Sequence, residues 1–301
     1  MAASIGSLAV SGVKVGSSFI NHAQKLASAM ISVTLAAIAA LLFVGHGWLT
    51  SGIFILLATF AAIIGEYGHS LVVVTTRFNI FLTIFINMFG NTQYREELLF
   101  SIIAGAIGTS SLSLVLGGSV HRCIVASIDA AMKETISQKI TRWWKSLAHL
   151  SGWQYTLRLT FCLCIAEALR FLCPNHHFFL IALTITILIQ RKIEPIPIKT
   201  TQRVLGTVLG VIATSLLLAN RLPVWGLVIS IGLLAGLRPL LKVRNYLVYS
   251  ASMIPLIILI MEAGNPFKFS ILIDRLIATL IGAGLVIVIN LVFSRMMTKT
   301  S

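Results

Sequence analysis

Ten apolar stretches separated by short polar segments dominate this chain. A helix needs about 20 mostly apolar residues to cross the hydrocarbon core of a bilayer, and most of these stretches approach that length. Only 11% of the residues are charged, whereas about 25% is usual in soluble domains, so lipid is the expected solvent. The predicted spans are 25–44, 49–65, 70–89, 97–118, 157–173, 177–190, 202–220, 222–240, 245–262 and 271–293.

The apolar pattern occurs twice in the chain. Three pairs of similar residues lie 177 positions apart and a fourth lies 178 apart: Trp48 and Trp225, Glu97 and Asp274, Gly105 and Gly282, then Lys25 and Arg203. Many transporters are built from such repeats, with the substrate site where the halves meet. The first half has four spans and the second has six, so counterparts of 157–190 are lacking. Residues 1–22 are expected to form an interfacial or frayed segment. Either an ancestral twelve-span form has lost its first pair, or another segment occupies that place.

The basic residues predict the orientation. Lys and Arg concentrate in alternate loops, most clearly after residue 119, and loop 66–69 with Glu66 is the exception. Positive loops mark the cytoplasmic side, so both termini are expected in the cytoplasm. The net charge of +14 is therefore assigned to orientation, because no groove-sized basic patch for nucleic acid is present. The predicted fold is an all-α polytopic membrane protein with about ten transmembrane helices in two unequal repeats.

Three domains follow from this pattern. Residues 1–118 form the first, degenerate repeat, and 157–301 form the second. Residues 119–156 lie between them, with Ile or Met at every fourth position from Ile124 to Ile140 and several Lys and Arg among them. This spacing predicts an amphipathic linker helix on the cytoplasmic side, which either lies on the anionic inner leaflet or packs against the bundle.

Four sequence features in the second half occur together and in order. Arg158 opens a helix with Ala166 midway, and a proline-containing turn follows at 190–197. Arg203-Val-Leu-Gly-Thr-Val-Leu-Gly then begins one span, and Asp274-Arg-Leu-Ile-Ala-Thr-Leu-Ile-Gly begins the last. With these features the stretch 157–295 resembles the fusaric-acid-resistance (FUSC) family, which includes aromatic acid exporters. The resemblance implies a transporter and supplies aromatic carboxylates as the substrate class.

The chain also departs from the family pattern. The second span begins Phe178-Phe179 where the family usually has Trp-Ala. In the first half, Lys25-Leu-Ala-Ser28 keeps small residues but loses the Gly-Thr pair, and only 119–156 is available where relatives carry a large cytoplasmic domain. These departures leave a non-transporting membrane scaffold open as an alternative.

Small residues in the second half predict close helix packing. Gly206 and Gly210, like Gly232 and Gly236, have the G-x-x-x-G spacing that lets two helix backbones approach in lipid. The predicted packing residues are Gly206, Thr207, Gly210, Gly232, Gly236 and Gly282.

Charged residues inside the spans are the candidates for a substrate or ion pathway, because ionisable groups are expensive in a bilayer. The candidates are Arg77, Arg158, Glu167, Arg170 and Arg203. Glu167 and Arg170 are three residues apart and can pair on one helix, either as a structural ion pair or as a proton or substrate relay. Arg203 either anchors its helix at the cytoplasmic interface or contacts an anionic substrate, and the same two alternatives hold for Arg77.

Other polar residues receive structural explanations. Asp274 and Arg275, with Glu97 as the repeat counterpart, are expected to cap and anchor helices. His176 and His177 are read as exposed loop residues. The four cysteines fit small apolar packing positions, so no disulfide and no metal site is expected.

The sequence contains no nucleophile–base set, phosphate loop or metal-ligand cluster, so neither an enzyme nor a cofactor is predicted. The leading hypothesis is proton-coupled efflux of small organic carboxylates across a bacterial inner membrane. The alternatives are an organic-anion channel and the membrane scaffold. The expected partners are the lipid bilayer, a small organic anion and a second copy or accessory subunit, without nucleic acid.

Overall fold

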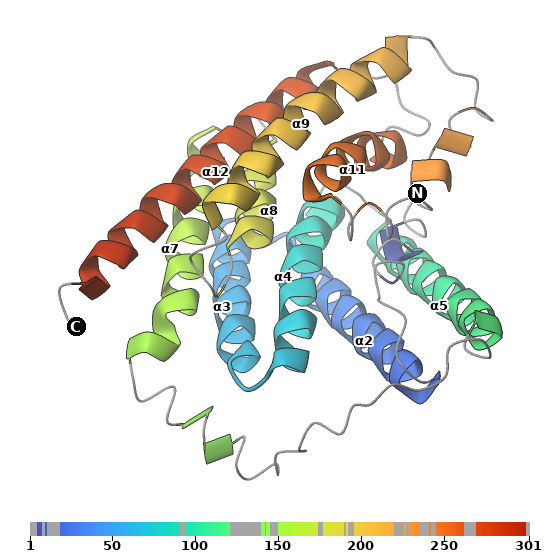
Figure 1. Cartoon of the computed structure of the whole chain (residues 1–301), viewed down its shortest axis with the longest axis horizontal. Coiled ribbons are helices and arrows are strands. Elements are labelled where there is room, and N and C mark those ends of the chain that lie inside the picture. Colours follow the sequence, from blue (N-terminus) through green and yellow to red (C-terminus); the bar gives the residue numbers. More distant parts are fainter. Residues whose placement is uncertain are drawn as a thin grey trace. The chain divides into compact units, whose positions relative to one another are not determined.

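The computed structural model describes most of the chain as helices with short connections. The described residues are 5–7, 10, 19–90, 94–120, 140–141, 143–144, 150–173, 177–189, 191, 196–219, 226, 229–230, 232–234, 241, 245–261 and 269–298. The helices are α2 (Phe19–Phe43), α3 (Trp48–Gly65), α4 (His69–Gly90), α5 (Arg95–Val120), α7 (Leu150–Leu172), α8 (Phe179–Leu188), α9 (Ile196–Ala219), α11 (Tyr246–Met261) and α12 (Phe269–Thr298). No strand occurs within these ranges, which confirms the all-α prediction (Figure 1).

The chain divides into two compact units. A first unit covers Ala2–Thr160, and a second covers Phe161–Ser301 together with Met1. Helix α7 runs through this division, since it begins at Leu150 and ends at Leu172.

In the first unit, α2 packs against α4 and α5, and α3 packs against α4. The buried face of α2 consists largely of small residues: Ala29, Ala36, Ala37 and Ala40 are fully buried. Small side chains let helix backbones approach closely, which strengthens van der Waals packing in lipid. The turn from α2 to α3 depends on Gly45 and Gly47, whose φ angles of 102° and 57° suit glycine because it has no Cβ.

The described N-terminal residues contact α5, which differs from the interfacial or frayed segment that the sequence predicted. Gly6 lies directly on the α5 backbone: a Cβ there would contact the Ile102 carbonyl and lie 3.1 Å from the Ala106 nitrogen. The Ser7 hydroxyl accepts a 2.7 Å hydrogen bond from Thr109. The absence of a Cβ on Gly6 thus allows the segment to pack tightly against α5.

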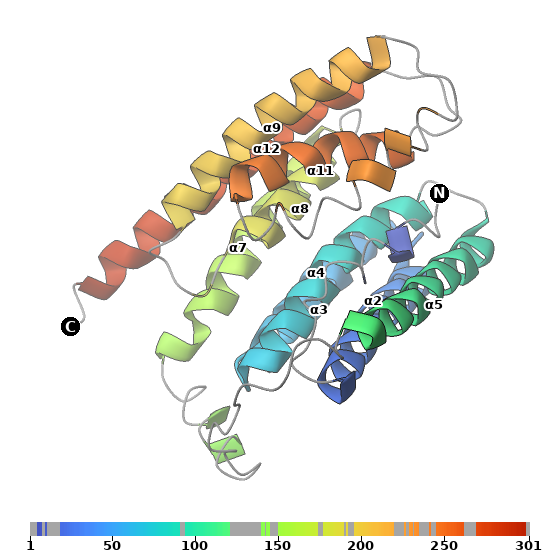
Figure 2. The same cartoon turned by 45° about the vertical axis from the view of Figure 1, so that its right-hand side comes forward.

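In the second unit, α9 packs against α11 and α12, and α8 packs against α12 and α9. Figures 1 and 2 both show α9 and α12 side by side and running in opposite directions. Helix α9 begins 177 residues after α2, and α11 begins 177 residues after α4. The partners of α2 and α9 also correspond, so each unit contains the same three-helix arrangement.

The membrane assignment rests on five described helices that are long and apolar enough to cross a bilayer. They are Ile20–Phe43, Trp48–Gly65, Leu71–Gly90, Arg95–Val115 and Leu272–Met296. Outward-facing apolar residues such as Leu42, Leu56 and Leu291 are more than half exposed, as expected where lipid is the solvent.

Some predicted boundaries change and others stay untested. The span predicted at 177–190 is the ten-residue helix α8, about 15 Å long at about 1.5 Å per residue, which is half of the hydrocarbon thickness. The span predicted at 222–240 and the amphipathic part of 119–156 lie largely outside the described residues. The ends of that predicted linker belong to α5, through Val120, and to α7, from Leu150. The count of ten spans and the side of the termini remain predictions.

Candidate functional site

The candidate site lies in the second unit, where α9, α11 and α12 meet around Arg203. This arginine is on the buried face of α9 and is only 3% exposed. Its Nη1 atom donates a long hydrogen bond of 3.4 Å to the Ser250 hydroxyl on α11. Its charge also acts on the hydroxyl of Tyr246, one turn earlier on α11. The guanidinium is therefore held between two helices.

Glycines on α9 bring α11 this close. A Cβ at Gly206 would lie 2.7 Å from the Ser250 Cβ, and a Cβ at Gly210 would lie 2.6 Å from the Ala251 carbonyl oxygen. Both distances are shorter than real Cβ contacts. The predicted packing face thus contacts α11 directly, and it positions Ser250 beside Arg203.

A second buried arginine, Arg275, comes from α12. It is 4% exposed, and the charge of Arg203 acts on its guanidinium. The Nε atom of Arg203 and the Nη2 atom of Arg275 are both buried, and neither donates a hydrogen bond to any described atom. Two like charges therefore lie near each other in an apolar bundle, where buried charge is expensive unless it is paired.

Each arginine is followed four residues later by a threonine that bonds back to it. The Thr207 hydroxyl donates to the Arg203 carbonyl at 2.8 Å, and Thr279 donates to the Arg275 carbonyl at 2.8 Å. Such back-bonding satisfies a hydroxyl within its own helix. The R-x-x-x-T spacing found in both motifs therefore reflects local helix chemistry.

Asp274, beside Arg275 in the chain, binds the segment before α8. Its Oδ2 atom accepts hydrogen bonds from the His177 backbone nitrogen at 3.2 Å and from the ring at Nδ1, 2.7 Å away. The carboxylate lies at the N-terminal end of α8, where negative charge is favourable. Asp274 therefore does not cap its own helix, because it is the sixth residue of α12. His177 is exposed, as expected, and Asp274 is its partner.

The first unit contains no such group at the equivalent positions. Buried positions on α2 and α9 match at an offset of 177, which places Leu26 opposite Arg203 and Ala29 opposite Gly206. Leu26 packs with Val10 and Ala106 in an apolar cluster. At the offset of 178 used in the sequence pairing, Lys25 is opposite Arg203 instead, and Lys25 is exposed. This three-helix arrangement can be built without a buried cation at that place.

The other predicted pathway residues lie apart from this group. Glu167 and Arg170 form the expected i,i+3 ion pair on α7, with Nη1 and Oε2 3.5 Å apart and side chains 6% and 35% exposed respectively. Arg158 is 1% exposed, and its Nε atom donates to the Gln154 carbonyl at 3.1 Å. Arg77 on α4 is partly exposed and makes at least one hydrogen-bond, ring or electrostatic contact.

The remaining predicted packing residues divide into two groups. Gly282 on α12 packs on α8, because a Cβ there would lie 3.0 Å from the Thr184 Cβ. No described atom lies within 4 Å of a Cβ built at Gly232, so no packing role is visible for that residue. Gly236 lies outside the described residues.

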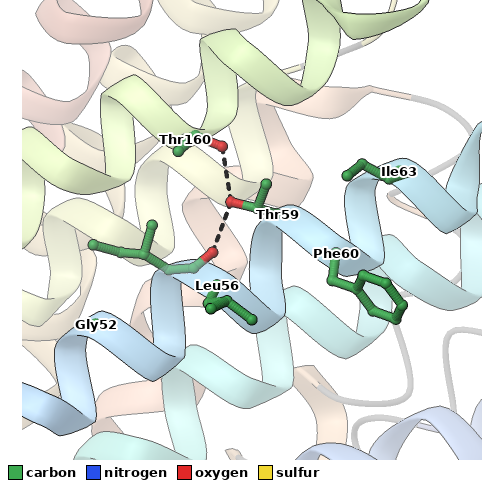
Figure 3. Close-up of a pocket in the computed structure, with 7 residues that line it drawn as sticks. Gly52, Leu56, Thr59, Phe60, Ile63 and Thr160 are labelled. Atoms are coloured by element: carbon green, nitrogen blue, oxygen red, sulfur yellow. Dashed lines mark hydrogen bonds between the residues drawn. The ribbon is translucent and has the colours of Figure 1, made fainter. Parts of the chain in front are cut away.

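A groove in the first unit has no comparable polar chemistry. It has a volume of about 410 Å³ and is lined by residues of α3 together with Thr160. Figure 3 shows Thr59 pointing toward Thr160, and their hydroxyl oxygens are 2.8 Å apart. Thr59 also donates to the Ile55 carbonyl at 2.7 Å, so its hydroxyl is already engaged within the protein. The groove is otherwise apolar, as expected for a surface in contact with lipid.

Sequence reasoning identified Arg203 but missed Arg275, Ser250 and Tyr246. The R-x-x-x-T spacing shared by the two motifs is the signal that could have linked the arginines. Among the described residues, no cluster of three or more His, Cys, Asp or Glu side chains could hold a metal ion.

Comparison with known proteins gives one match. Residues 161–289 match a family model described as fusaric acid resistance protein-like, which agrees with the resemblance assigned to 157–295. No curated protein matches the chain, and no solved structure does. The matched segment contains α8, α9 and α11 with most of α12, and so includes the arginine group.

Proposed function

Because residues 161–289 belong to the FUSC family, we propose that this multi-pass membrane protein exports small organic carboxylates, aromatic ones included, across a bacterial inner membrane. Coupling to protons and the outward direction are parts of the same proposal. The aromatic substrate class comes from the family resemblance. The anionic character of the substrate has independent support from the side chains inside the second unit.

One observation carries the proposal: ionisable side chains are buried inside the helices of the family-matched segment. Arg203, Asp274 and Arg275 are each no more than 5% exposed, although they lie within helices of an apolar bundle. Ionisable groups at such positions commonly mark substrate or ion pathways, because burial without use is costly. The cations attract an anion, and a buried carboxyl group can accept a proton.

Glu167 is the carboxyl group proposed to carry the coupling proton. It is 4% exposed, and its contact with Arg170 at 3.5 Å is longer than a strong charge-assisted hydrogen bond of about 2.7–2.9 Å. The pair can therefore separate when the carboxyl group is protonated, which allows proton uptake to change the packing of α7.

Flux measurements in proteoliposomes test the proposal. Vesicles loaded with labelled benzoate are studied with and without an imposed pH gradient, with protein-free vesicles as the control. A proton-coupled exporter gives flux that increases with the gradient. Flux that follows membrane voltage and ignores the pH gradient identifies an anion channel, and flux equal to that of empty vesicles identifies a scaffold.

Two variants with matched chemistry assign the coupling proton. Glu167→Gln is expected to abolish the response to the pH gradient, because an amide cannot take up the proton. Glu97→Gln, on an exposed residue of α5, is the control and is expected to keep the response. A normal response in Glu167→Gln would remove Glu167 from the coupling mechanism.

A further inference from the structure

We propose that the Arg203–Arg275 pair is a binding site for a single carboxylate group, held between α9 and α12 and completed by Ser250 and Tyr246 of α11. This inference specifies a site for the proposed export function and rests on that function for its physiological role. Binding itself can be tested without transport.

Unused hydrogen-bond donors are the first part of the argument. An arginine carries five N–H donors and no acceptor. Arg203 donates one bond of 3.4 Å to Ser250, which is at the weak end of the range, and it also hydrogen-bonds the Tyr246 hydroxyl. Its Nε atom, like the Nη2 atom of Arg275, is buried and has no acceptor among the described atoms. Each arginine thus offers at least one buried donor to a ligand.

The polar groups nearest in sequence to the two arginines have partners of their own. The hydroxyl groups of Thr207 and Thr279 donate to carbonyls of their own helices. Asp274, the carboxylate nearest in sequence, accepts two hydrogen bonds from His177. Among the described groups, the Nε atom of Arg203 and the Nη2 atom of Arg275 therefore have no hydrogen-bond acceptor, and a negatively charged oxygen atom could supply one.

The positive charges of Arg203 and Arg275 also favour an anion. The two guanidinium groups repel each other electrostatically. Both residues are buried, with exposures of 3% for Arg203 and 4% for Arg275. An anion between them would replace a repulsion with two attractions. Because guanidinium groups are planar forks that match two-oxygen acceptors, a carboxylate fits this pair better than a spherical anion does.

Both arginines lie well inside their helices. Arg203 is the eighth residue of α9 and Arg275 is the seventh of α12, and the two helices run in opposite directions (Figure 2). Each arginine therefore lies about 10 Å inside its own helix, at about 1.5 Å per residue. Val211 of α9 packs against the cluster of Leu272 of α12 and Ile254 of α11, so Arg203 lies about two turns from this contact along α9 and Arg275 about one turn from it along α12.

The aromatic side of the site comes from α11. Tyr246 and Tyr249 form a tilted ring pair with centroids 6.0 Å apart, and Tyr246 is the ring on whose hydroxyl the Arg203 charge acts. A flat apolar group attached to the carboxylate can pack against these rings. Benzoate is accordingly the simplest probe.

The first unit supplies the substitution for the test. At the position equivalent to Arg203 it has Leu26, which is buried in an apolar cluster, and at the position equivalent to Arg275 it has Leu98. Arg203→Leu and Arg275→Leu therefore copy a solution that this helix arrangement already uses, so both variants are expected to fold.

Calorimetric titration of the purified protein with benzoate, in chloride-free buffer, tests the site. Each leucine variant is expected to lose at least about tenfold in affinity, in keeping with loss of a charged hydrogen bond. Arg295→Leu, on the same helix α12 but exposed, is the control and should bind normally. Wild-type affinity in Arg203→Leu and Arg275→Leu would overturn the inference.

Further measurements separate the remaining outcomes. Arg203→Lys keeps the charge and removes the fork, so it should bind more weakly than the wild type even if a leucine variant does not fold; unchanged affinity there would also overturn the inference. Competition by chloride as effective as that of benzoate would identify a structural counter-ion site, and preference for phosphate would exclude a carboxylate site. Benzoate binding without flux in the vesicle assay would contradict the exporter and leave the site standing. Flux unaffected by Arg203→Leu would contradict the site and leave the exporter standing.

Discussion

The contact between α9 and α11 gives a prediction whose size can be worked from distances. A Cβ at Gly210 would lie 2.6 Å from the Ala251 carbonyl oxygen, whereas ordinary contacts begin near 3.4 Å, so α9 must move by about 0.8 Å in Gly210→Ala. A gap of about 0.5–1 Å forfeits a quarter to a half of the dispersion attraction at the affected contacts. Overpacking of this kind typically costs about 1–3 kcal/mol.

Helix propensity acts in the opposite direction and needs its own control. Replacing glycine by alanine inside a helix stabilises it by about 1 kcal/mol, which conceals part of the packing cost. Gly284 on α12 has no described atom within 4 Å of a built Cβ and is exposed, so Gly284→Ala changes propensity alone. The difference between the two variants isolates the packing term.

The assay is unfolding in detergent, followed by helix content in an SDS titration. Gly210→Ala is expected to be less stable than Gly284→Ala by about 1–3 kcal/mol. Equal stability of the two variants would show that α9 and α11 separate without cost, and it would refute the account of Gly206 and Gly210 as close-packing residues.

Three further predictions concern the ion pair, Asp274 and the orientation. If the Glu167–Arg170 pair is structural, Glu167→Gln should destabilise the protein and adding Arg170→Gln should restore part of the loss in a double-mutant cycle of melting temperatures, because the double variant leaves neither charge without its partner; strict additivity would rule out a structural pair. Asp274→Asn removes the negative charge that accepts from His177 at the N-terminal end of α8 and should cost about 0.3–1 kcal/mol, measured by thermal unfolding, and an unchanged melting temperature would argue against this stabilisation. A cysteine at 265 should react with an impermeant thiol reagent from outside while one at 199 should not, and equal labelling would contradict the proposed orientation.

Helix positions were predictable here because a helix that crosses lipid must be apolar along its length, so apolar stretches indicate the spans. The stretch 49–65 became Trp48–Gly65, and 70–89 became His69–Gly90. Helix starts were less predictable: α2, α7 and α9 begin at Phe19, Leu150 and Ile196, six or seven residues before their predicted spans, because a helix can begin in polar sequence ahead of its apolar stretch. An apolar stretch buried by protein looks the same in sequence as one that faces lipid.

The candidate site was only half predictable, for a physical reason. Arg203 stood out because it occurs in a glycine-containing motif, whereas Arg275 at the start of the last span had the ordinary explanation of an interface anchor. Its burial depends on α9, which is distant in sequence, and long-range packing leaves no local pattern. Sequence likeness pairs Lys25 with Arg203 at an offset of 178, whereas the starts of α2 and α9 differ by 177 and place the buried Leu26 opposite Arg203.

The shortness of α8 has a consequence for the membrane voltage. The helix is about 15 Å long. Of its last four carbonyl groups, which lack partners within a helix, that of Ile185 accepts from the Ile189 nitrogen directly after the helix. Lipid cannot supply such partners, and eight of its ten residues are buried, so protein or water must border its end. If water borders it, the voltage there falls over a thinner barrier. A monovalent anion that crosses the whole voltage gains about 2.3 kcal/mol per 100 mV, equivalent to a concentration ratio of about fifty. An inside-negative potential would therefore assist outward movement of a carboxylate beside this helix.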